Sequence, residues 1–241
     1  MAKKLLAFDT STEVMFIAVT DGQRTWQHTE AGGALTSAAL IPAIMALLLQ
    51  AKLKLTDLDA IVFGRGPGSF TGLRTACSVA QGLAFGAGGL PVLPIDTLLA
   101  VAEEARFVQG ATQVVALLDA RMSEVYTARY EWLTPDEAGA DAGWHARTGV
   151  QLMRPEQLHG ALGPPWVLAG NAFDPAGPLK DMLPLAVPHM NALPTATAML
   201  RLAPDLLARG LGVPAEQALP LYIRDKVAQT TAERAAIKST T

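Results

Sequence analysis

Cysteine and histidine, the residues that most often carry metal or redox chemistry, are scarce in this chain. Its 241 residues include one cysteine, Cys77, which excludes a disulfide framework and a thiolate metal cage and is typical of a reducing cytoplasm. The four histidines are His28, His145, His159 and His189. No two of them have the spacing that places two ligands on one face of a helix, so we expect no metal site.

Charged and aromatic residues are also few. They make up 17% and 6% of the chain, whereas 50% of the residues are hydrophobic. Soluble domains contain roughly 25% charged residues, so the sequence predicts apolar surface that another molecule covers. The formal net charge of -3 argues against a large basic surface for nucleic acid.

Two uncharged stretches, residues 31–51 and 75–95, are not typical of membrane spans. A spanning helix needs ~20 mainly apolar residues. Pro42 interrupts the first stretch, and several glycines and prolines interrupt the second. The apolar run near the N-terminus ends at Asp9, too early for an export signal. We therefore expect helices that pack against protein, no membrane contact and a cytoplasmic location.

The first half of the sequence predicts an α/β unit with the element order βββαβαβα. The predicted strands are residues 4–8, 14–20, 24–28, 60–63 and 92–95, and the predicted helices include residues 37–51, 73–84 and 97–107. The Asp21–Gly22 pair predicts a tight hairpin turn. Alanines at positions 76, 80 and 84 recur every four residues and permit close approach of another helix.

Near residue 110 the pattern restarts. An apolar run ends at Asp119 and a strand returns over 125–130, much as the first run ends at Asp9. This faint internal repeat predicts two related lobes. We place the first lobe at residues 1–109, with 219–241 as a segment that can complete it, and a smaller second lobe at 110–218. Within and after the second lobe we expect an irregular segment at 133–149, a strand at 166–169, a helix at 195–209 and a polar tail at 226–241.

The glycine-rich segment from Gly64 to Gly72 is the most informative. It lacks the lysine of the phosphate loop Gly-x4-Gly-Lys-Ser/Thr, and Ser69 stands where Gly-x-Gly-x-x-Gly requires its last glycine. The segment predicts a tight strand-to-helix connection with Ser69 or Thr71 as the N-cap. A structural or partner-facing role and direct ligand contact both remain open.

Asp9 ends a predicted strand and is followed by Thr10, Ser11 and Thr12. This order is typical of a phosphate-binding turn, in which hydroxyls and N–H groups face an anion and a carboxylate orients a metal-bound water. The same residue types also form ordinary turns that close a hairpin. Asp9, Thr10 and Ser11 are therefore candidate phosphate ligands, with the plain turn as the alternative.

Other catalytic arrangements find little support. The single cysteine falls on the apolar face of a predicted helix, where a free thiol packs as a small hydrophobe. The sequence contains no His-x3-His or His-Glu-x2-His, which excludes the usual zinc peptidase. Asp119 and Glu124 could form an acid pair, and Arg65, Arg74 and Arg121 could meet an anion. Such side chains are more often solvated or paired with neighbours, so we predict no catalytic residue.

Four segments together resemble the TsaB (YeaZ) family. The first is the run from Leu5 to Thr12, and the last is Pro220 to Arg224. The glycine-rich segment contributes Gly64, Arg65, Gly66, Pro67, Gly68, Ser69, Phe70, Thr71, Gly72, Leu73 and Arg74. The restart contributes Asp119, Ala120, Arg121, Met122, Ser123, Glu124, Val125 and Tyr126. The resemblance covers nearly the whole chain in the right order, and the glycine-rich segment is its most specific part.

The resemblance implies two RNase H-like lobes of the actin, sugar kinase and chaperone (ASKHA) superfamily. It implies a non-catalytic subunit needed for threonylcarbamoyl transfer to adenosine 37 of tRNAs that read ANN codons. The catalytic paralogue of that family, TsaD, holds a metal through two histidines four residues apart, whereas residues 34–40 here contain no histidine. TsaD and the small ATPase TsaE are the implied partners, a homodimer forms in isolation, tRNA is reached indirectly, and ATP or ADP belongs to the complex.

The resemblance also gives the apolar helices a role. TsaB proteins pair with TsaD, and with themselves, through two helices of the first lobe. We expect this interface to contain Leu40, Ile44, Leu48, Leu73, Ala76, Ala80 and Leu83. The competing interpretations are a stand-alone ATPase or kinase that uses Asp9 and Thr10 for phosphate, and a homodimeric interaction module with no role in tRNA.

Overall fold

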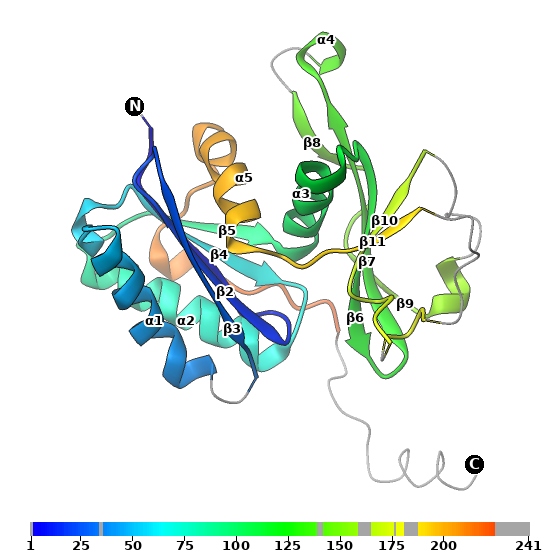
Figure 1. The fold of residues 1–241 in the computed structure, drawn as a ribbon, viewed down its shortest axis with the longest axis horizontal. Helices are drawn as coiled ribbons and strands as arrows, with labels where there is room; N and C mark the ends of the chain where they lie inside the picture. The colour runs from blue at the N-terminus through cyan, green and yellow to red at the C-terminus, as the bar shows by residue number, and fades with distance from the viewer. Residues whose placement is uncertain are drawn as a thin grey trace, which may run out of the picture.

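The computed structural model describes residues 2–33, 36–138, 142–158, 165–175, 177–180 and 188–224. These residues form two mixed α/β sheets with helices between and beside them (Figure 1). The predicted tail at 226–241, His159 and the first two residues of the stretch 34–40 lie outside the described residues. Within the described part of the chain, no helix combines the length and the apolarity needed to cross a membrane.

The first sheet has five strands in the order β3-β2-β1-β4-β5. They are β1 (Leu5–Asp9), β2 (Val14–Thr20), β3 (Thr25–Ala31), β4 (Ala60–Gly66) and β5 (Val92–Asp96). The first three strands form the predicted antiparallel meander because short turns join them, and β4 and β5 add parallel to β1 through helical crossovers. The β2–β3 turn uses residues 21–24 rather than two, because the Asp21 carboxylate accepts hydrogen bonds from the amides of Gln23 and Arg24.

Two helices cover one face of this sheet, α1 (Thr36–Gln50) and α2 (Phe70–Gly86) (Figure 1). A short 3-10 helix, η1 (Leu55–Asp57), follows α1, and a second one, η4 (Ala215–Gln217), lies against α2. The buried side chains of both long helices pack with the sheet side chains Phe8 and Phe63 in a single core cluster. The alanines of α2 belong to this core, so their four-residue spacing brings the helix close to the sheet.

The second sheet repeats the topology of the first. Its strands are β6 (Gln113–Arg121), β7 (Glu124–Leu133), β8 (Gly143–Ala146), β9 (Gln151–Met153), β10 (Val167–Gly170) and β11 (His189–Asn191). The order β8-β7-β6-β10-β11 again joins an antiparallel meander to two parallel strands, and β9 pairs with β7. The shared topology confirms the two related lobes that the internal repeat predicts, and the two sheets are consistent with the RNase H-like lobes that the family resemblance implies.

The segment predicted to be irregular, residues 133–149, contains a helical turn, α4 (Pro135–Ala138), and strand β8. This prediction was wrong because β8 is short and lacks a clear alternation of apolar residues. The strand is fixed by tertiary contacts instead. Trp144 pairs with Trp132 of β7, and its ring packs edge to face on Trp132 and Tyr130.

Two helices lie between the sheets, α3 (Thr97–Gln109) and α5 (Ala196–Ala208) (Figure 1). The boundary drawn from the sequence puts residues 195–209 in the second lobe, but α5 packs on the first sheet in a cluster with Leu5, Val62 and Leu93. In return α3, which follows the first sheet, packs on β6 and β7 of the second. Sequence order alone does not reveal this exchange. The lobe limits at 109/110 and 218/219 remain a prediction.

Candidate functional site

The glycine-rich segment lies directly against the turn that follows β1. A Cβ on residue 64 would stand 1.8 Å from Asp9 Oδ2, and one on residue 72 would stand 1.8 Å from the Thr10 carbonyl oxygen. A Cβ on residue 68 would lie 2.6 Å from Ser11 Cβ. The Ser69 amide donates to the Ser11 carbonyl over 2.7 Å. Only glycines allow this close approach, so Gly64, Gly68 and Gly72 are needed for the loop to pack against the turn.

Gly66 has a different role in the same segment. Its φ of +120° lies in the region that favours glycine, and a Cβ there would stand 2.7 Å from the Leu221 carbonyl oxygen. The Leu221 amide in turn donates to the Arg65 carbonyl over 2.7 Å. The loop thus holds the C-terminal segment from Leu219 to Arg224 on one side while its other glycines hold the β1 turn.

The three candidate phosphate ligands are buried and bonded to their own chain. Asp9 is fully buried, and its Oδ1 accepts hydrogen bonds from the Ser11 amide at 2.8 Å and the Ser11 hydroxyl at 2.7 Å. The Thr10 hydroxyl donates to the Gly72 carbonyl over 2.7 Å. These hydrogen bonds are those of a plain turn, and a role of the three residues as phosphate ligands stays a prediction.

The electrostatic state of Asp9 fits this structural role. Burial raises the pKa of its carboxyl to about 7, and the hydrogen bonds from Ser11 lower it only in part. The second oxygen, Oδ2, is buried without a hydrogen-bond partner. This carboxyl is enclosed by the chain and does not reach solvent.

A cavity of about 690 Å³ opens between the two lobes beside this turn. One wall is formed by Ser11, Thr12 and Glu13 with residues 67–70 at the start of α2, and the opposite wall by residues 118–122. Residues 221–224 also line the cavity. The cavity thus brings together six residues of the family motif: Pro67, Gly68, Ser69, Phe70, Asp119 and Arg121.

The turn between β6 and β7 forms the second wall and contains no glycine. Arg121, Met122 and Ser123 adopt positive φ angles of 63°, 56° and 56°, which side chains disfavour. The side chains of Asp119 and Arg224 hold the turn. The Asp119 carboxylate accepts a hydrogen bond from the Arg121 amide at 2.7 Å, and Arg224 donates to the carbonyls of Ala120 and Arg121 and to the Glu124 carboxylate.

The three arginines of the motif do not converge on one point. Arg65 forms an ion pair with Asp96, and Arg121 forms one with Glu13 across the cavity. Arg74 lies over the Phe70 ring, 3.8 Å from its centroid, and donates to the Tyr222 hydroxyl over 3.1 Å. The three arginines therefore do not form a shared anion site. Thr71, at the start of α2, is exposed.

Sequence reasoning missed the site roles of Tyr222, Arg224 and Glu13. Tyr222 and Arg224 belong to the Pro220–Arg224 motif, but the motif alone does not show which residues they contact. The role of Glu13 depends on its distance from Arg121, which no local pattern shows.

The predicted partner face needs a correction. Leu40, Ile44, Leu48, Leu73, Ala76 and Ala80 are buried in the core, and Leu83 is partly buried against it. The apolar residues spaced three and four apart on α1 and α2 form the side of each helix that faces the sheet. The large apolar side chains that α1 leaves exposed are Ile41, Met45 and Leu49, and Phe85 near the end of α2 is also exposed. Because α1 is apolar on nearly all sides, its pattern did not distinguish the two faces.

Within the described residues, no three His, Cys, Asp or Glu side chains are grouped so that they could hold a metal ion. Cys77 is buried, burial raises the pKa of its thiol, and its Sγ lies 3.0 Å from the Ala218 carbonyl oxygen. These residues form part of the packing of α2.

Comparisons with known proteins match the TsaD family model and individual TsaB and YeaZ proteins. The model of the TsaD family, tRNA N6-adenosine threonylcarbamoyltransferase, matches residues 28–232. The tRNA threonylcarbamoyladenosine biosynthesis protein TsaB of Escherichia coli is 36% identical over 229 residues, which cover 93% of this chain and 96% of that protein. TsaB of Haemophilus influenzae is 34% identical over 235 residues, or 92% and 94% of the two chains. The solved structure of YeaZ from Pseudomonas aeruginosa superposes with a TM-score of 0.77 at 38% identity, covering 91% of this chain and 99% of that one.

Proposed function

The chain belongs to the TsaB (YeaZ) family of tRNA threonylcarbamoyladenosine biosynthesis proteins, and from this premise we propose that it is a non-catalytic subunit of the cytoplasmic machinery that modifies tRNA. It binds and activates the catalytic subunit TsaD, which transfers a threonylcarbamoyl group to adenosine 37 of ANN-decoding tRNAs. TsaE joins the assembly as its ATPase, and tRNA is contacted chiefly by the other subunits.

The single observation that carries the non-catalytic assignment is the state of the first turn. Asp9 is fully buried with a raised pKa, and the hydroxyls of Thr10 and Ser11 donate to groups of the chain itself. An ASKHA-type kinase or ATPase needs these groups to face the phosphates. The turn at Asp119–Met122 also lacks the glycines that bring backbone N–H groups close to a nucleotide. We therefore assign ATP or ADP to the complex and not to this chain alone.

The partner surface that we propose is the outer face of α1 with the end of α2. Ile41, Met45 and Leu49 are 44%, 47% and 79% exposed, and Phe85 is 84% exposed. No residue of α1 carries a charge. An apolar stripe of this kind favours docking of an apolar helical surface of a partner. Burial of the stripe is favourable because it removes apolar area from water and no charged group loses its hydration. TsaD is the proposed occupant, and a second copy of this chain occupies the same face in isolation.

Reconstitution tests this proposal. Purified TsaD, TsaE and tRNA, with ATP and a threonylcarbamoyl donor, should form the modified nucleoside only when this chain is present, as measured by mass spectrometry of tRNA digests. The Asp9→Asn variant should support the same yield once its folding has been verified. ATP hydrolysis by the chain alone that Asp9→Asn abolishes would instead establish the stand-alone ATPase.

A further inference from the structure

Strand β3 forms one edge of the first sheet (Figure 1). It pairs with β2 along its whole length without a register shift, and among the described residues no strand pairs with its outer side. Proteins usually protect such an edge with a proline, a lysine, a bulge or a covering segment. The seven residues of β3 include no proline and no lysine, and most of them are exposed. The edge is therefore open to the addition of another strand.

The backbone groups of alternate residues point outward from this edge. The Arg24 carbonyl accepts a hydrogen bond from the Asp21 amide, and the Gly32 amide donates to the Glu13 carbonyl. The residues of β3 that bond to β2 are therefore the even-numbered ones, because hydrogen-bonded pairs alternate in an antiparallel ladder. The N–H and C=O groups that face away from β2 belong to Thr25, Gln27, Thr29 and Ala31, which are all exposed.

Helix α1 is the helix nearest this edge. It contacts β2 and β3, whereas α2 contacts β1, β4 and β5. The exposed apolar stripe of Ile41, Met45 and Leu49 lies on α1. A pair of strands is marginal without further contacts, and a stable interface buries roughly 800 Å² per partner. The apolar stripe supplies a second surface beside the open edge.

The charges along β3 favour a second copy of this chain as the added strand. An antiparallel copy centred on Gln27 places Glu30 opposite Arg24 of the other copy, twice by symmetry. Centring on His28 instead places that histidine opposite itself and Glu30 opposite Trp26. Centring on Thr29 pairs Glu30 with His28 but extends to residue 33, beyond the end of the strand at Ala31. Only the register at Gln27 both pairs Glu30 with arginine and stays within residues 24–30.

From these observations we propose that a second copy of this chain adds its β3 antiparallel to this one, about a twofold axis at Gln27, so that one sheet runs through both copies. The inference rests on the proposed function in one respect, because the two copies also meet through α1. The charge pattern of β3 is complementary to itself. A second copy therefore engages both α1 and β3, whereas TsaD engages the α1 face without β3.

Disulfide trapping tests the register. In a Cys77→Ser background, Gln27→Cys leaves one thiol in each chain. Directly opposed residues of a hydrogen-bonded pair have Cα atoms about 5.5 Å apart, which a disulfide can span. The two copies of Thr25→Cys, or of Thr29→Cys, lie at least about 13 Å apart in this register. In a glutathione redox buffer, Gln27→Cys should give at least about tenfold more crosslinked dimer than the other two variants.

Charge reversal tests the pairing without a crosslink. Arg24→Glu and Glu30→Arg each place like charges opposite one another at both symmetric positions. Each should weaken self-association about tenfold in analytical ultracentrifugation. The double variant restores opposite charges and should return the dissociation constant to within about threefold of the parent value. Arg154→Glu reverses an exposed arginine of the second sheet and is the matched control, with no expected change. TsaD binding should be the same in all four variants.

Several outcomes would overturn the strand pairing. They are equal crosslinking at the three cysteine positions, a highest yield at Thr25→Cys or Thr29→Cys, self-association that neither charge reversal weakens, a double variant as weak as the single ones, and a parent chain that stays monomeric. Weaker TsaD binding in the β3 variants would contradict the selectivity for a second copy.

Leu49→Arg separates this inference from the proposed function. If it abolishes self-association and TsaD binding while the β3 variants change neither, the α1 surface stands and the strand pairing fails. If Leu49→Arg leaves TsaD binding intact while the β3 reversals weaken self-association, the proposed TsaD surface fails and the strand pairing stands.

Discussion

The Oδ2 atom of Asp9 lies 1.8 Å from the point where a Cβ would stand on residue 64. The buried carboxyl and the first glycine of the glycine-rich segment therefore occupy one shared space. This contact explains why a glycine is required near the end of β4. The glycine at this position of the motif is needed for packing against Asp9.

Gly64→Ala should destabilise the protein by at least about 2 kcal/mol, because overpacking a buried site forces side chains and backbone to move. Gly82→Ala is the matched control: residue 82 lies within α2, and a Cβ there meets nothing within 4 Å. That change should stabilise the protein by up to about 1 kcal/mol through helix propensity. Urea unfolding measures both, and a tolerated Gly64→Ala would contradict the packing role.

The buried Asp9 carboxyl should make stability depend on pH. Its pKa is raised from 3.8 to about 7 in the folded chain. The folded state then binds one more proton than the unfolded state between these values, so the free energy of unfolding falls as pH rises from about 4 to about 7, by up to about 4 kcal/mol. Asp9→Asn should remove this fall. Urea unfolding at pH 5 and pH 8 compares the two proteins, and an unchanged pH dependence in the variant would rule out Asp9 as its source.

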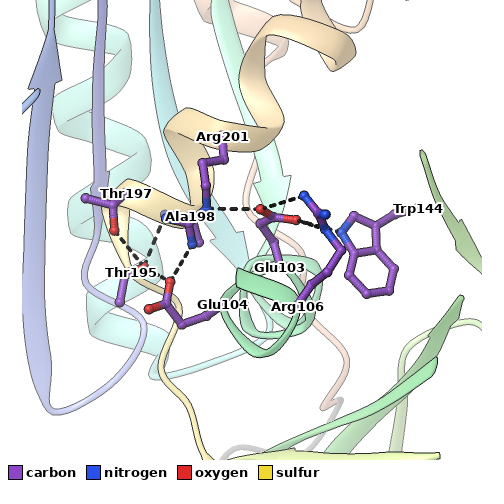
Figure 2. Close-up of polar contacts among 8 residues, drawn as sticks. All are labelled: Glu103, Glu104, Arg106, Trp144, Thr195, Thr197, Ala198 and Arg201. Atoms are coloured by element: carbon purple, nitrogen blue, oxygen red, sulfur yellow. Dashed lines mark hydrogen bonds and ion pairs between the residues drawn. The ribbon is translucent and has the colours of Figure 1, made fainter. Parts of the chain in front are cut away.

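Glu103→Gln should cost about 1–3 kcal/mol of stability, because the buried Glu103 carboxylate accepts hydrogen bonds from the partly exposed Arg201 and Arg106 (Figure 2) and a neutral amide is a weaker acceptor. Asp205→Asn removes a partner of Arg209 on the surface of α5. Exposed pairs contribute about 0–1 kcal/mol, so this control should differ little from the parent chain. Similar losses in the two variants would show that the buried Glu103 carboxylate has no special role.

Leu48 and Leu49 are adjacent on α1 but differ in burial, at 2% and 79% exposed. Leu49→Arg should leave the stability unchanged and abolish both self-association and TsaD binding in analytical ultracentrifugation. Leu48→Arg should prevent stable folding, because it places a charge in the core. A Leu49→Arg variant that still dimerises and binds TsaD would exclude the outer face of α1 as the interface.

The turn between β6 and β7 places Ser123 at a φ of 56°. A left-handed conformation costs roughly 1–2 kcal/mol for a residue with a side chain, and glycine loses part of that gain through unfolded-state entropy. Ser123→Gly should therefore stabilise the protein by about 0.5–1 kcal/mol. Ser78→Gly, on the exposed side of α2, should have the opposite sign. Thermal unfolding separates the two, and a destabilised Ser123→Gly would show that the serine side chain has an essential contact.

Much of the fold could be predicted from local patterns. The hairpins around Asp9 and Asp119, the strand-to-helix order and the repeat of one topology follow from short apolar runs and turn residues. The position of α5 on the first sheet could not be predicted, because it depends on contacts with residues nearly 200 positions earlier, such as Leu5. Strand β8 was missed because Trp144 holds it through cross-strand packing rather than through a local pattern.

The candidate site was predicted in its residues more than in their roles. The sequence marked Asp9 and Gly64, but only their contact reveals that the acid is enclosed by the loop. On α1 the periodicity selected Leu40, Ile44 and Leu48, which form the core, because periodicity detects the buried stripe of a helix. Which side of α1 stays exposed depends on where the neighbouring elements pack, and only the tertiary structure shows this.

The most direct test of the central proposal is the tRNA of cells depleted of this protein. Mass spectrometry of digested tRNA should show loss of threonylcarbamoyladenosine, restored by the parent chain and by Asp9→Asn, but not by Leu49→Arg. An unchanged level of the modified nucleoside after depletion would contradict a role for this chain in the modification.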